Sequence, residues 1–446
     1  MRKKRPFMIV NTTLMTRGGD ETSFYPIEIT PLYVGVRKAG VIDKTLLRLI
    51  TDGGKRVIGG GYVEPLIYDH TGFKEEGAKA SSQGARLVSV ESDKKRYTFT
   101  LKDTMAASGA APHEYLRKFG LTATGFPEFR HWSPMTEPEL ASSGRTKWRD
   151  KKGVYEFPHG DGGHMDNYGL MPLLARQVQN IVVFANAPNP FDPQNSYRVE
   201  LAVNQAVEKR RKQLTGTYGM TPEQLEAELK EVAREAEADE REELADELIL
   251  DEDMLSLFPD HSGDNRYVSE DQWEKVRGMK PFNQVFASGL NEMVENFRQD
   301  RQNGEPLLHC GQYRLKIPHE NRYDIVVPAT YRPKICWVYL SDSIQWKNRL
   351  TVRTFNTPQN KKPIKDQVVQ ELKDGVGRHF KRFPHYKTFF ENRDKETGTR
   401  KMIDLSKEQV VALSQLTSWS LHRVEDEIFT FFGLKGGESG TPSDGQ

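Results

Sequence analysis

The chain has few cysteines, no long apolar run and almost no net charge, and each of these deficits excludes a class of protein. Its 446 residues include two cysteines, Cys310 and Cys336, which are too few for a disulfide framework and are not spaced as metal ligands. We therefore interpret both as small buried residues of a protein in a reducing compartment. The apolar run at residues 7–10 is too short for a signal peptide, and no run is long enough to cross a membrane.

The composition is that of an ordinary globular protein of the cytoplasm. Charged residues make up 28% of the chain and hydrophobic residues 36%, and the formal net charge is +1. This balance gives no bias toward nucleic acid, so we expect no nucleic-acid partner. The basic residues 2–5 are either a solvated tail or a peripheral contact with anionic lipid. The acidic run Asp251-Glu252-Asp253 lacks the pattern of a calcium loop, so we predict no metal site and no cofactor.

The most informative stretch begins with Asp161, Gly162 and Gly163, which follow a short predicted strand at residues 153–157. Two glycines allow a positive φ and a close approach of backbone to the turn. A helix is predicted from Asn167, and the apolar run at 180–185 is typical of a strand buried on both faces. The order strand, turn, helix, strand places Asp161 at the ligand-binding edge of an α/β sheet. The alternative is that Asp161 only closes a Gly-rich turn.

The string DGGHMDNYGLMPLL at 161–174, followed by QNIVVFANAP, resembles the acid-bearing motif of patatin-like and cytosolic phospholipase A2-like acyl hydrolases. In that family the Asp of DGG activates a serine in a Ser-Asp dyad. The resemblance therefore implies that Asp161 is the catalytic acid of the dyad and that Gly162 and Gly163 lie at the substrate. It also implies a three-layer α/β/α domain and a phospholipid or other lipid ester as substrate.

The nucleophile of such a dyad is missing, because no Gly-x-Ser-x-Gly motif occurs anywhere in the sequence. In the family, the oxyanion loop and this serine lie upstream of strings that resemble VNTTLM and YPIEITPLYVGV here. The chain thus resembles the C-terminal portion of the family domain, N-terminally incomplete. We expect the serine to come from a complementary chain or an upstream reading frame, and we expect an unpaired sheet edge near residues 7–10.

Two alternatives to this half-enzyme stay open. One is a catalytically dead interaction module. The other is an esterase that uses Ser108, although Ala106 and Ala110 stand where a nucleophile elbow needs glycine. The string MAASGAAP around Ser108 also resembles a small-residue helix that the family carries downstream of its catalytic serine.

Composition also predicts how the chain is organised. Residues 6–195 and 265–435 are assigned to one α/β domain. Residues 205–260 form a charged helical insertion, in which 221–254 is acidic and carries apolar residues at helical spacing. That acidic helix is either a solvated face or a helix that docks a partner or closes a lid. Residues 436–446 are predicted to be a disordered tail.

Overall fold

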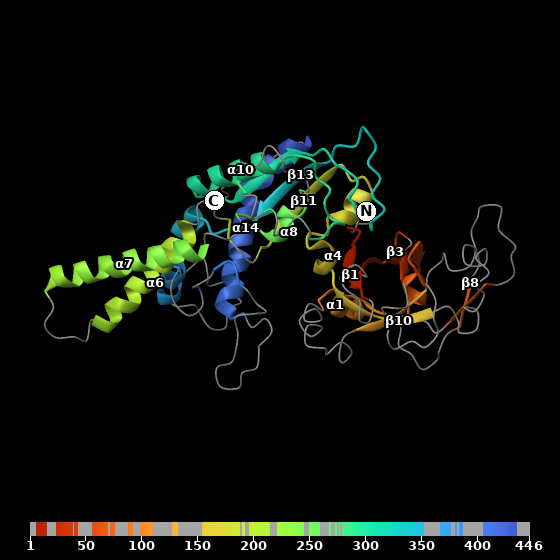
Figure 1. Ribbon diagram of the computed structural model, residues 1–446, viewed down its shortest axis with the longest axis horizontal. Helices are drawn as coiled ribbons and strands as arrows, with labels where there is room; N and C mark the ends of the chain where they lie inside the picture. The colour runs from red at the N-terminus through yellow and green to blue at the C-terminus, as the bar shows by residue number, and fades with distance from the viewer. Residues whose placement is uncertain are drawn as a thin grey trace, which may run out of the picture. The chain divides into compact units, whose positions relative to one another are not determined.

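The computed structural model shows a mixed α/β protein, whose helices and strands are drawn in Figure 1. Within the described residues, no helix combines the length and the apolar character that a membrane span requires. The predicted tail at 436–446 lies outside the described residues. The structure describes residues 6–15, 24–38, 40–42, 56–69, 72–75, 88–91, 99–109, 127–132, 154–187, 190–191, 196–214, 221–244, 249–258, 267–268, 273, 276, 279–351, 366–375, 380, 383–386 and 405–434.

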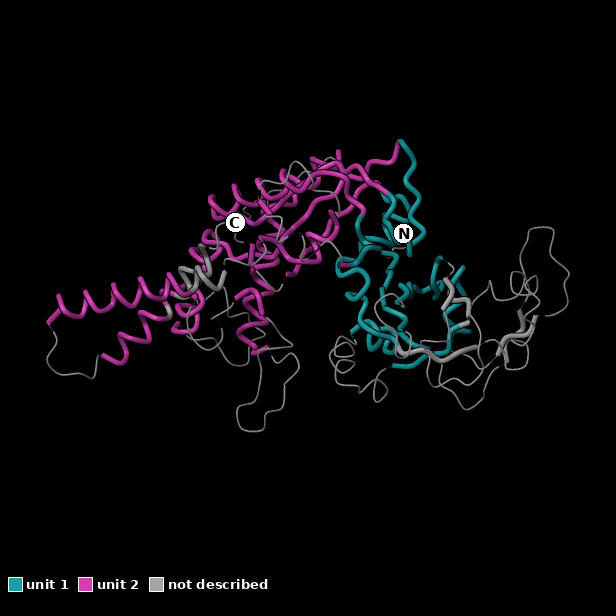
Figure 2. Tube along the Cα trace, viewed as in Figure 1, with its two compact units in different colours: residues 1–178, 280–284, 317–329 teal, residues 179–279, 285–316, 330–446 magenta. Residues whose placement is uncertain are grey.

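The chain divides into two compact units (Figure 2). Unit 1 comprises residues 1–178, 280–284 and 317–329, and unit 2 comprises residues 179–279, 285–316 and 330–446. The first boundary falls directly after the predicted Asp161 turn and its helix. Residues 280–284 and 317–329 belong to unit 1 although the chain before and after them belongs to unit 2. Each unit is therefore made of segments that are not continuous in sequence.

Unit 1 is built on a six-stranded sheet in which every neighbouring pair is antiparallel. Strand β1 lies inside this sheet and pairs with β2 on one side and β10 on the other. In spatial order the strands are β6 (Gly61–Val63), β3 (Val34–Val36), β2 (Tyr25–Ile29), β1 (Val10–Leu14), β10 (Val154–Asp161) and β9 (Glu128–Trp132).

Smaller elements complete unit 1. Two hairpins have their own two-stranded sheets, and four short helices lie between or after the strands of this unit. The hairpins are β4 (Gly40–Ile42) with β5 (Arg56–Ile58) and β7 (Gly72–Glu75) with β8 (Val88–Glu91), and the helices are η3 (Pro65–Ile67), α1 (Leu101–Ser108), α4 (Gly163–Asp166) and α5 (Met171–Ala175).

The core of unit 1 combines aliphatic side chains from the strands with a group of aromatic rings. Leu14, Ile27 and Val34 are fully buried, because strand alternation turns them to one face of the sheet. Phe99 packs edge-on against Tyr68 and against Phe129, with ring centroids 5.0 Å apart in both pairs. Such edge-to-face pairs are a favoured aromatic geometry and hold α1 and η3 against the sheet.

Unit 2 has a three-stranded sheet in the order β11 (Asn180–Ala185), β13 (Lys334–Tyr339), β12 (Leu307–Gln312). Strand β13 is parallel to β11 and antiparallel to β12. One face of this sheet packs against α14 (Lys407–Phe432) through Val424 and Ile428. The predicted strand at 180–185 is confirmed, but its expected burial on both faces is wrong, because Asn180 and Phe184 are exposed.

The remaining helices of unit 2 include the expected charged insertion. Helices α6 and α7 pack against each other, and an ion pair joins Arg210 to Glu228 across them. Leu225, Leu229 and Val232 of α7 are half-buried on one side, whereas most of its charged residues are exposed, as an amphipathic helix predicts. The helices are α6 (Ser196–Leu214), α7 (Pro222–Leu244), α8 (Glu252–Leu255), α10 (Leu290–Asn303), α11 (Ile344–Arg349) and α13 (Asp366–Lys373).

The strands on either side of the Asp161 turn belong to different sheets, contrary to the predicted single α/β sheet. Strand β10 ends at Asp161 in the antiparallel sheet of unit 1, and β11 lies in the sheet of unit 2. The order strand, turn, helix, strand is compatible with either arrangement, because periodicity does not encode which strands pair. The sequence assigned 6–195 to one domain, and the division at residue 178 lies inside that range.

The expected free edge near residues 7–10 is wrong, because β1 is paired on both sides. Phe7 and Met8 nevertheless lie exposed just before this strand, at 52% and 43% of their accessible surface. Within the described residues, the edge strands of the unit 1 sheet are β6 and β9.

The interpretation of Cys310 and Cys336 as small buried residues outside any disulfide is also wrong. Cys310 on β12 lies directly opposite Cys336 on β13, and the two sulfurs form a disulfide. Opposite positions on antiparallel strands bring two Cβ atoms within bonding reach, and the register of the strands is not visible in a cysteine count. The cysteine content therefore gives no indication of a reducing compartment.

Candidate functional site

The end of β10 is fixed by two buried threonines of β1. The Oγ1 atom of Thr12 donates to the carbonyl of Gly160 at 2.9 Å, and that of Thr13 donates to the carbonyl of Asp161 at 2.7 Å. Both threonines are 0% exposed. These side-chain bonds supplement the β1–β10 ladder at the point where the strand ends, so they hold the backbone of Asp161 in place.

The side chain of Asp161 is half-buried and makes a local hydrogen bond. Its Oδ1 atom accepts the backbone N–H of Gly163 at 2.9 Å, which closes a turn of the type that aspartate commonly forms with the residue two positions on. Within the described residues, no hydrogen-bond donor reaches Oδ2. One carboxylate oxygen is therefore oriented by the backbone, and the other is open to accept a proton or a further donor.

The two glycines differ in why they are needed. Gly162 has φ −58°, which any residue can adopt, so the expected positive φ is wrong for it. A Cβ at Gly162 would lie 2.4 Å from the backbone carbonyl oxygen of Asn11, so the expected close approach is confirmed. A Cβ at Gly163 would first meet the side-chain Oδ1 of Asn167 at 3.0 Å, a contact that a side chain can relieve. Gly162 thus brings the turn onto β1.

The helix predicted from Asn167 is interrupted. Helix α4 ends at Asp166 and α5 begins at Met171, with Gly169 between them at φ +64°. The carboxylate of Asp166 bridges this break, since it accepts the N–H of Met171 at 2.8 Å and the N–H of Tyr168 at 3.3 Å. Burial raises the pKa of Asp166 to about 6. Asp166 therefore satisfies the first N–H of α5, whose N-cap residue is Leu170, and Asn167 instead ends α4.

A segment more than a hundred residues downstream completes the turn. The ammonium group of Lys280 donates to the carbonyl of Gly163 at 2.7 Å, and the side-chain amide of Asn283 donates to the carbonyl of Met165 at 2.5 Å. Both residues belong to unit 1 with the turn they contact. Sequence reasoning missed them, because spacing along the chain carries no signal for a segment that returns from another unit.

His164 is a packed residue of the turn. It is half-buried, and its ring lies 6.1 Å from the ring of Phe24. A Cβ at Gly160 would lie 3.3 Å from Cδ2 of this histidine. His164 therefore lies against β10 and does not project from the turn as a surface histidine.

Ser108 is the last residue of α1 and lies close to the same carbonyl as the turn. Its Oγ donates to the backbone oxygen of Asn11 at 2.9 Å. The proton of the hydroxyl is thereby directed to a carbonyl, and no hydrogen bond joins Ser108 to Asp161, both of which are described. The structure thus brings Ser108 to the neighbourhood of the Gly162 turn without arranging it as a dyad serine.

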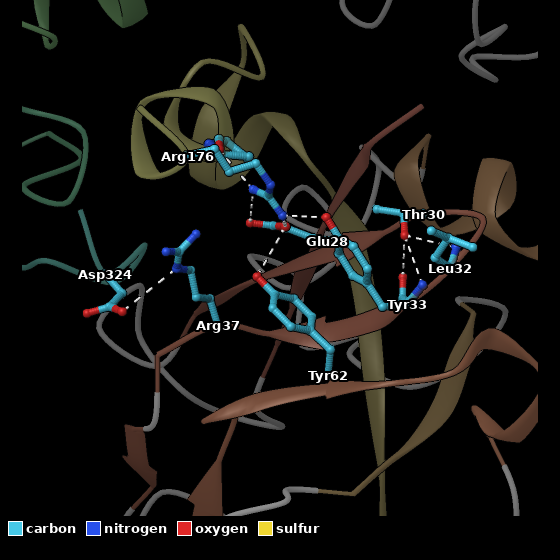
Figure 3. Close-up of polar contacts among 9 residues, drawn as sticks. Glu28, Thr30, Leu32, Tyr33, Arg37, Tyr62, Arg176 and Asp324 are labelled. Carbon is cyan, nitrogen blue, oxygen red and sulfur yellow. Dashed lines mark hydrogen bonds and ion pairs between the residues drawn. The ribbon is translucent and has the colours of Figure 1, made fainter. Parts of the chain in front are cut away.

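A buried ion pair anchors the far end of α5 to the sheet (Figure 3). Glu28 on β2 is 3% exposed, and its two carboxylate oxygens accept hydrogen bonds from the two terminal nitrogens of Arg176. Arg176 follows α5 directly. The hydroxyl of Tyr62 also donates to Glu28 at 3.2 Å, and Arg176 bonds the hydroxyl of Tyr33 at 2.5 Å. Burial and the neighbouring carboxylate raise the pKa of Tyr62, so it remains a donor. This network is fully paired and is therefore interpreted as structural.

Within the described part of the chain, no three His, Cys, Asp or Glu side chains are grouped to hold a metal ion. Comparison of the chain with protein-family models, with curated proteins and with solved structures finds no match. The geometry around Asp161 and the resemblance of its motif are therefore the two observations that bear on function.

The first prediction concerns the contact between the turn and β1. We expect Gly162→Ala to lower the free energy of unfolding of unit 1 by about 2 kcal/mol, because its Cβ would overlap a backbone oxygen that is held by the sheet. Gly163→Ala is the matched control, and we expect it to cost under about 1 kcal/mol, because a side chain can move away. Denaturant titration of both variants measures this difference. Equal costs would contradict the account of Gly162.

The second prediction concerns pH. Burial raises the pKa of Asp166 from its ordinary 3.8 to about 6, so the folded state binds this proton more tightly than the unfolded state does. The resulting stabilisation is fully present below pH 3.8 and is lost as the pH rises through about 6. Relative to Asp166→Asn, the natural chain should gain about 1 kcal/mol in unfolding free energy between pH 7 and pH 5. Denaturant titration measures the unfolding free energy of both chains at each pH. If the natural chain gains no stability relative to Asp166→Asn as the pH is lowered from 7 to 5, the raised pKa of Asp166 is contradicted.

Proposed function

We propose that this chain is part of a patatin-like lipid acyl hydrolase and supplies Asp161 as the acid of a Ser-Asp dyad. The proposed domain is the C-terminal portion of a three-layer α/β/α fold with the α6–α7 hairpin as an insertion. The serine and the oxyanion loop come from a complementary polypeptide that carries Gly-x-Ser-x-Gly. The substrate is a phospholipid or another lipid ester, reached in the cytoplasm or at a membrane surface.

The observation that carries this proposal is the orientation of the Asp161 carboxylate. It is placed at a strand end by Thr13 and held through Oδ1 by the N–H of Gly163, while Oδ2 takes no donor from the described residues. A general base needs this combination, in which one oxygen fixes the direction of the carboxylate and the other accepts the proton. The motif match of residues 161–174 supports the same role.

The chemistry proposed for this group is a direct proton transfer. The hydroxyl of the complementary serine attacks the ester carbonyl, and its proton passes to Asp161 as the serine oxygen bonds to the acyl carbon. Backbone N–H groups of the complementary oxyanion loop hold the negative charge of the tetrahedral intermediate. The alcohol leaves with a proton from Asp161, and water then cleaves the acyl-serine with Asp161 acting again as base.

Two other functions remain candidates, and each has one observation in its favour. An esterase that uses Ser108 is favoured by the contact that Ser108 and Gly162 share with the Asn11 carbonyl. A catalytically dead interaction module is favoured by the hydrogen bond between Asp161 and Gly163, which a purely structural turn would also make. The direction of the Ser108 hydroxyl disfavours the esterase.

The third prediction tests the dyad by complementation. The purified chain should hydrolyse neither short-chain esters nor phospholipid vesicles above background, and addition of a polypeptide with Gly-x-Ser-x-Gly encoded next to this chain should restore turnover. In that mixture, Asp161→Asn should lower the rate on the order of 10³-fold, because an amide still accepts the Gly163 N–H but takes no proton.

The matched control for this experiment is Asp324→Asn. Asp324 is also an aspartate of unit 1, its side chain is 51% exposed, and it pairs with Arg37 at 3.7 Å. Its φ of +54° is one that asparagine tolerates, so the variant should keep the fold and the activity. Turnover by the chain alone would contradict the half-enzyme, and full activity of the Asp161 variant in the mixture would end the dyad assignment.

A further inference from the structure

Among the described residues, strand β11 forms an edge of the unit 2 sheet. Strand β11 pairs with β13 on one side, and within the described residues no strand pairs with its other side. In a parallel ladder, alternate residues turn both their N–H and their C=O toward the same neighbour. The carbonyls of Gln179 and Ala185 accept from Lys334 and Leu340, so the odd-numbered residues face β13.

The even-numbered residues of β11 therefore present their backbone groups outward. These residues are Asn180, Val182 and Phe184, and no described residue bonds to the backbone of any of them. Three N–H groups and three C=O groups thus alternate along one exposed edge. An extended strand is the element whose backbone matches this spacing.

The opposite edge of the same sheet is strand β12, and a side chain bonds to one of its outward backbone groups. On β12, the outward N–H of Leu308 donates to the carboxylate of Asp300 on α10 at 2.8 Å. A helix side chain thus occupies the ladder of that edge, which is one of the devices that proteins use to prevent strand addition.

The outer residues of β11 also lack the usual protection of an edge strand. Natural edges carry lysine, proline or a bulge, whereas β11 has none of these. Ile181 and Val183 are buried at 3% and 4% exposure, but Phe184 on the opposite face is 52% exposed. An apolar strand with an exposed phenylalanine, whose outward backbone groups have no partner among the described residues, is suited to association.

We propose that β11 pairs with β11 of a second copy of this chain, antiparallel, about a two-fold axis at Val182. In this register Val182 faces Val182 of the second copy, and Asn180 faces Phe184 on both sides of the axis. Each of these three facing pairs exchanges two backbone hydrogen bonds, so the six bonds satisfy all three outward N–H groups and all three outward C=O groups of each copy. The two three-stranded sheets then form one continuous sheet.

This self-complementary match is the reason to choose a second copy as the occupant. A six-residue strand pair is smaller than a standard permanent interface, so we expect a weak dimer with a dissociation constant on the order of 10–100 μM. The inference goes beyond the proposed function and does not depend on it, because dimerisation is measured without substrate or complementary serine.

The fourth prediction tests this dimer by sedimentation equilibrium of the full chain with its disulfide intact. Val182→Pro removes an outward N–H and leaves the ladder to β13 complete, so it should weaken dimerisation by at least about tenfold while the circular dichroism spectrum is unchanged. Phe184→Asp places charges at the edge without a proline and should weaken dimerisation similarly. Ile344→Asp, at a 65% exposed apolar residue elsewhere in unit 2, should leave it unchanged.

Two results would overturn the proposal. One is a natural chain that stays monomeric to several hundred micromolar, which would leave the edge to a strand of another protein. The other is a dimer whose affinity neither the Val182 nor the Phe184 variant alters, which would place the contact elsewhere. If Val182→Pro fails to fold, the Phe184 and Ile344 variants decide the question by themselves.

Discussion

The backbone carbonyl of Asn11 is the point on which the candidate site depends. Gly162 approaches it so closely that a methyl group would overlap it, and the hydroxyl of Ser108 donates to it from α1. Because β1 is held between β2 and β10, this carbonyl is rigid. The turn that carries Asp161 and the end of α1 are therefore both positioned by one atom of an interior strand.

Buried charge fixes the rest of the turn. The carboxylate of Asp166 joins α4 to α5 by bonding backbone N–H groups across the break, and the pair of Glu28 with Arg176 ties the end of α5 to β2. Lys280 adds a cation at the carbonyl of Gly163. Removal of one member of such a buried group is costly, because its partner stays desolvated. With both ends of the segment held in this way, the carboxylate of Asp161 has little freedom except rotation about its own bonds.

The parts of the fold that sequence predicts correctly are those that depend on local pattern. The apolar run at 180–185 is a strand, the acidic stretch after Thr221 is an amphipathic helix, and Gly162 marks a close backbone approach. Local pattern does not specify which strands are neighbours. For this reason the sequence analysis joined β10 and β11 in one sheet, placed an unpaired edge at β1 and interpreted Cys310 and Cys336 as buried residues outside any disulfide.

For the candidate site itself, the sequence identifies Asp161 and the two glycines but not the residues that hold them. Thr12, Thr13 and Lys280 reach the turn through strand register and through a segment that returns from unit 2. Each of these contacts joins residues that are more than a hundred positions apart in the chain. The spacing of residues along the sequence does not predict such pairs. The helix expected from Asn167 begins later, at Met171, and the buried carboxylate of Asp166 bonds two N–H groups across the break, which spacing alone does not reveal.

The central claim is that Asp161 is a base for a serine that lies outside this sequence. Covalent labelling with a fluorophosphonate, followed by peptide mapping, tests it most directly, because the reagent marks an activated serine wherever it lies. The account predicts no adduct on any serine of the purified chain, Ser108 included, and an adduct on the complementary polypeptide only when this chain is present. An adduct at Ser108 of the purified chain, lost in the Asp161→Asn variant, would contradict it and would make this chain a self-contained esterase.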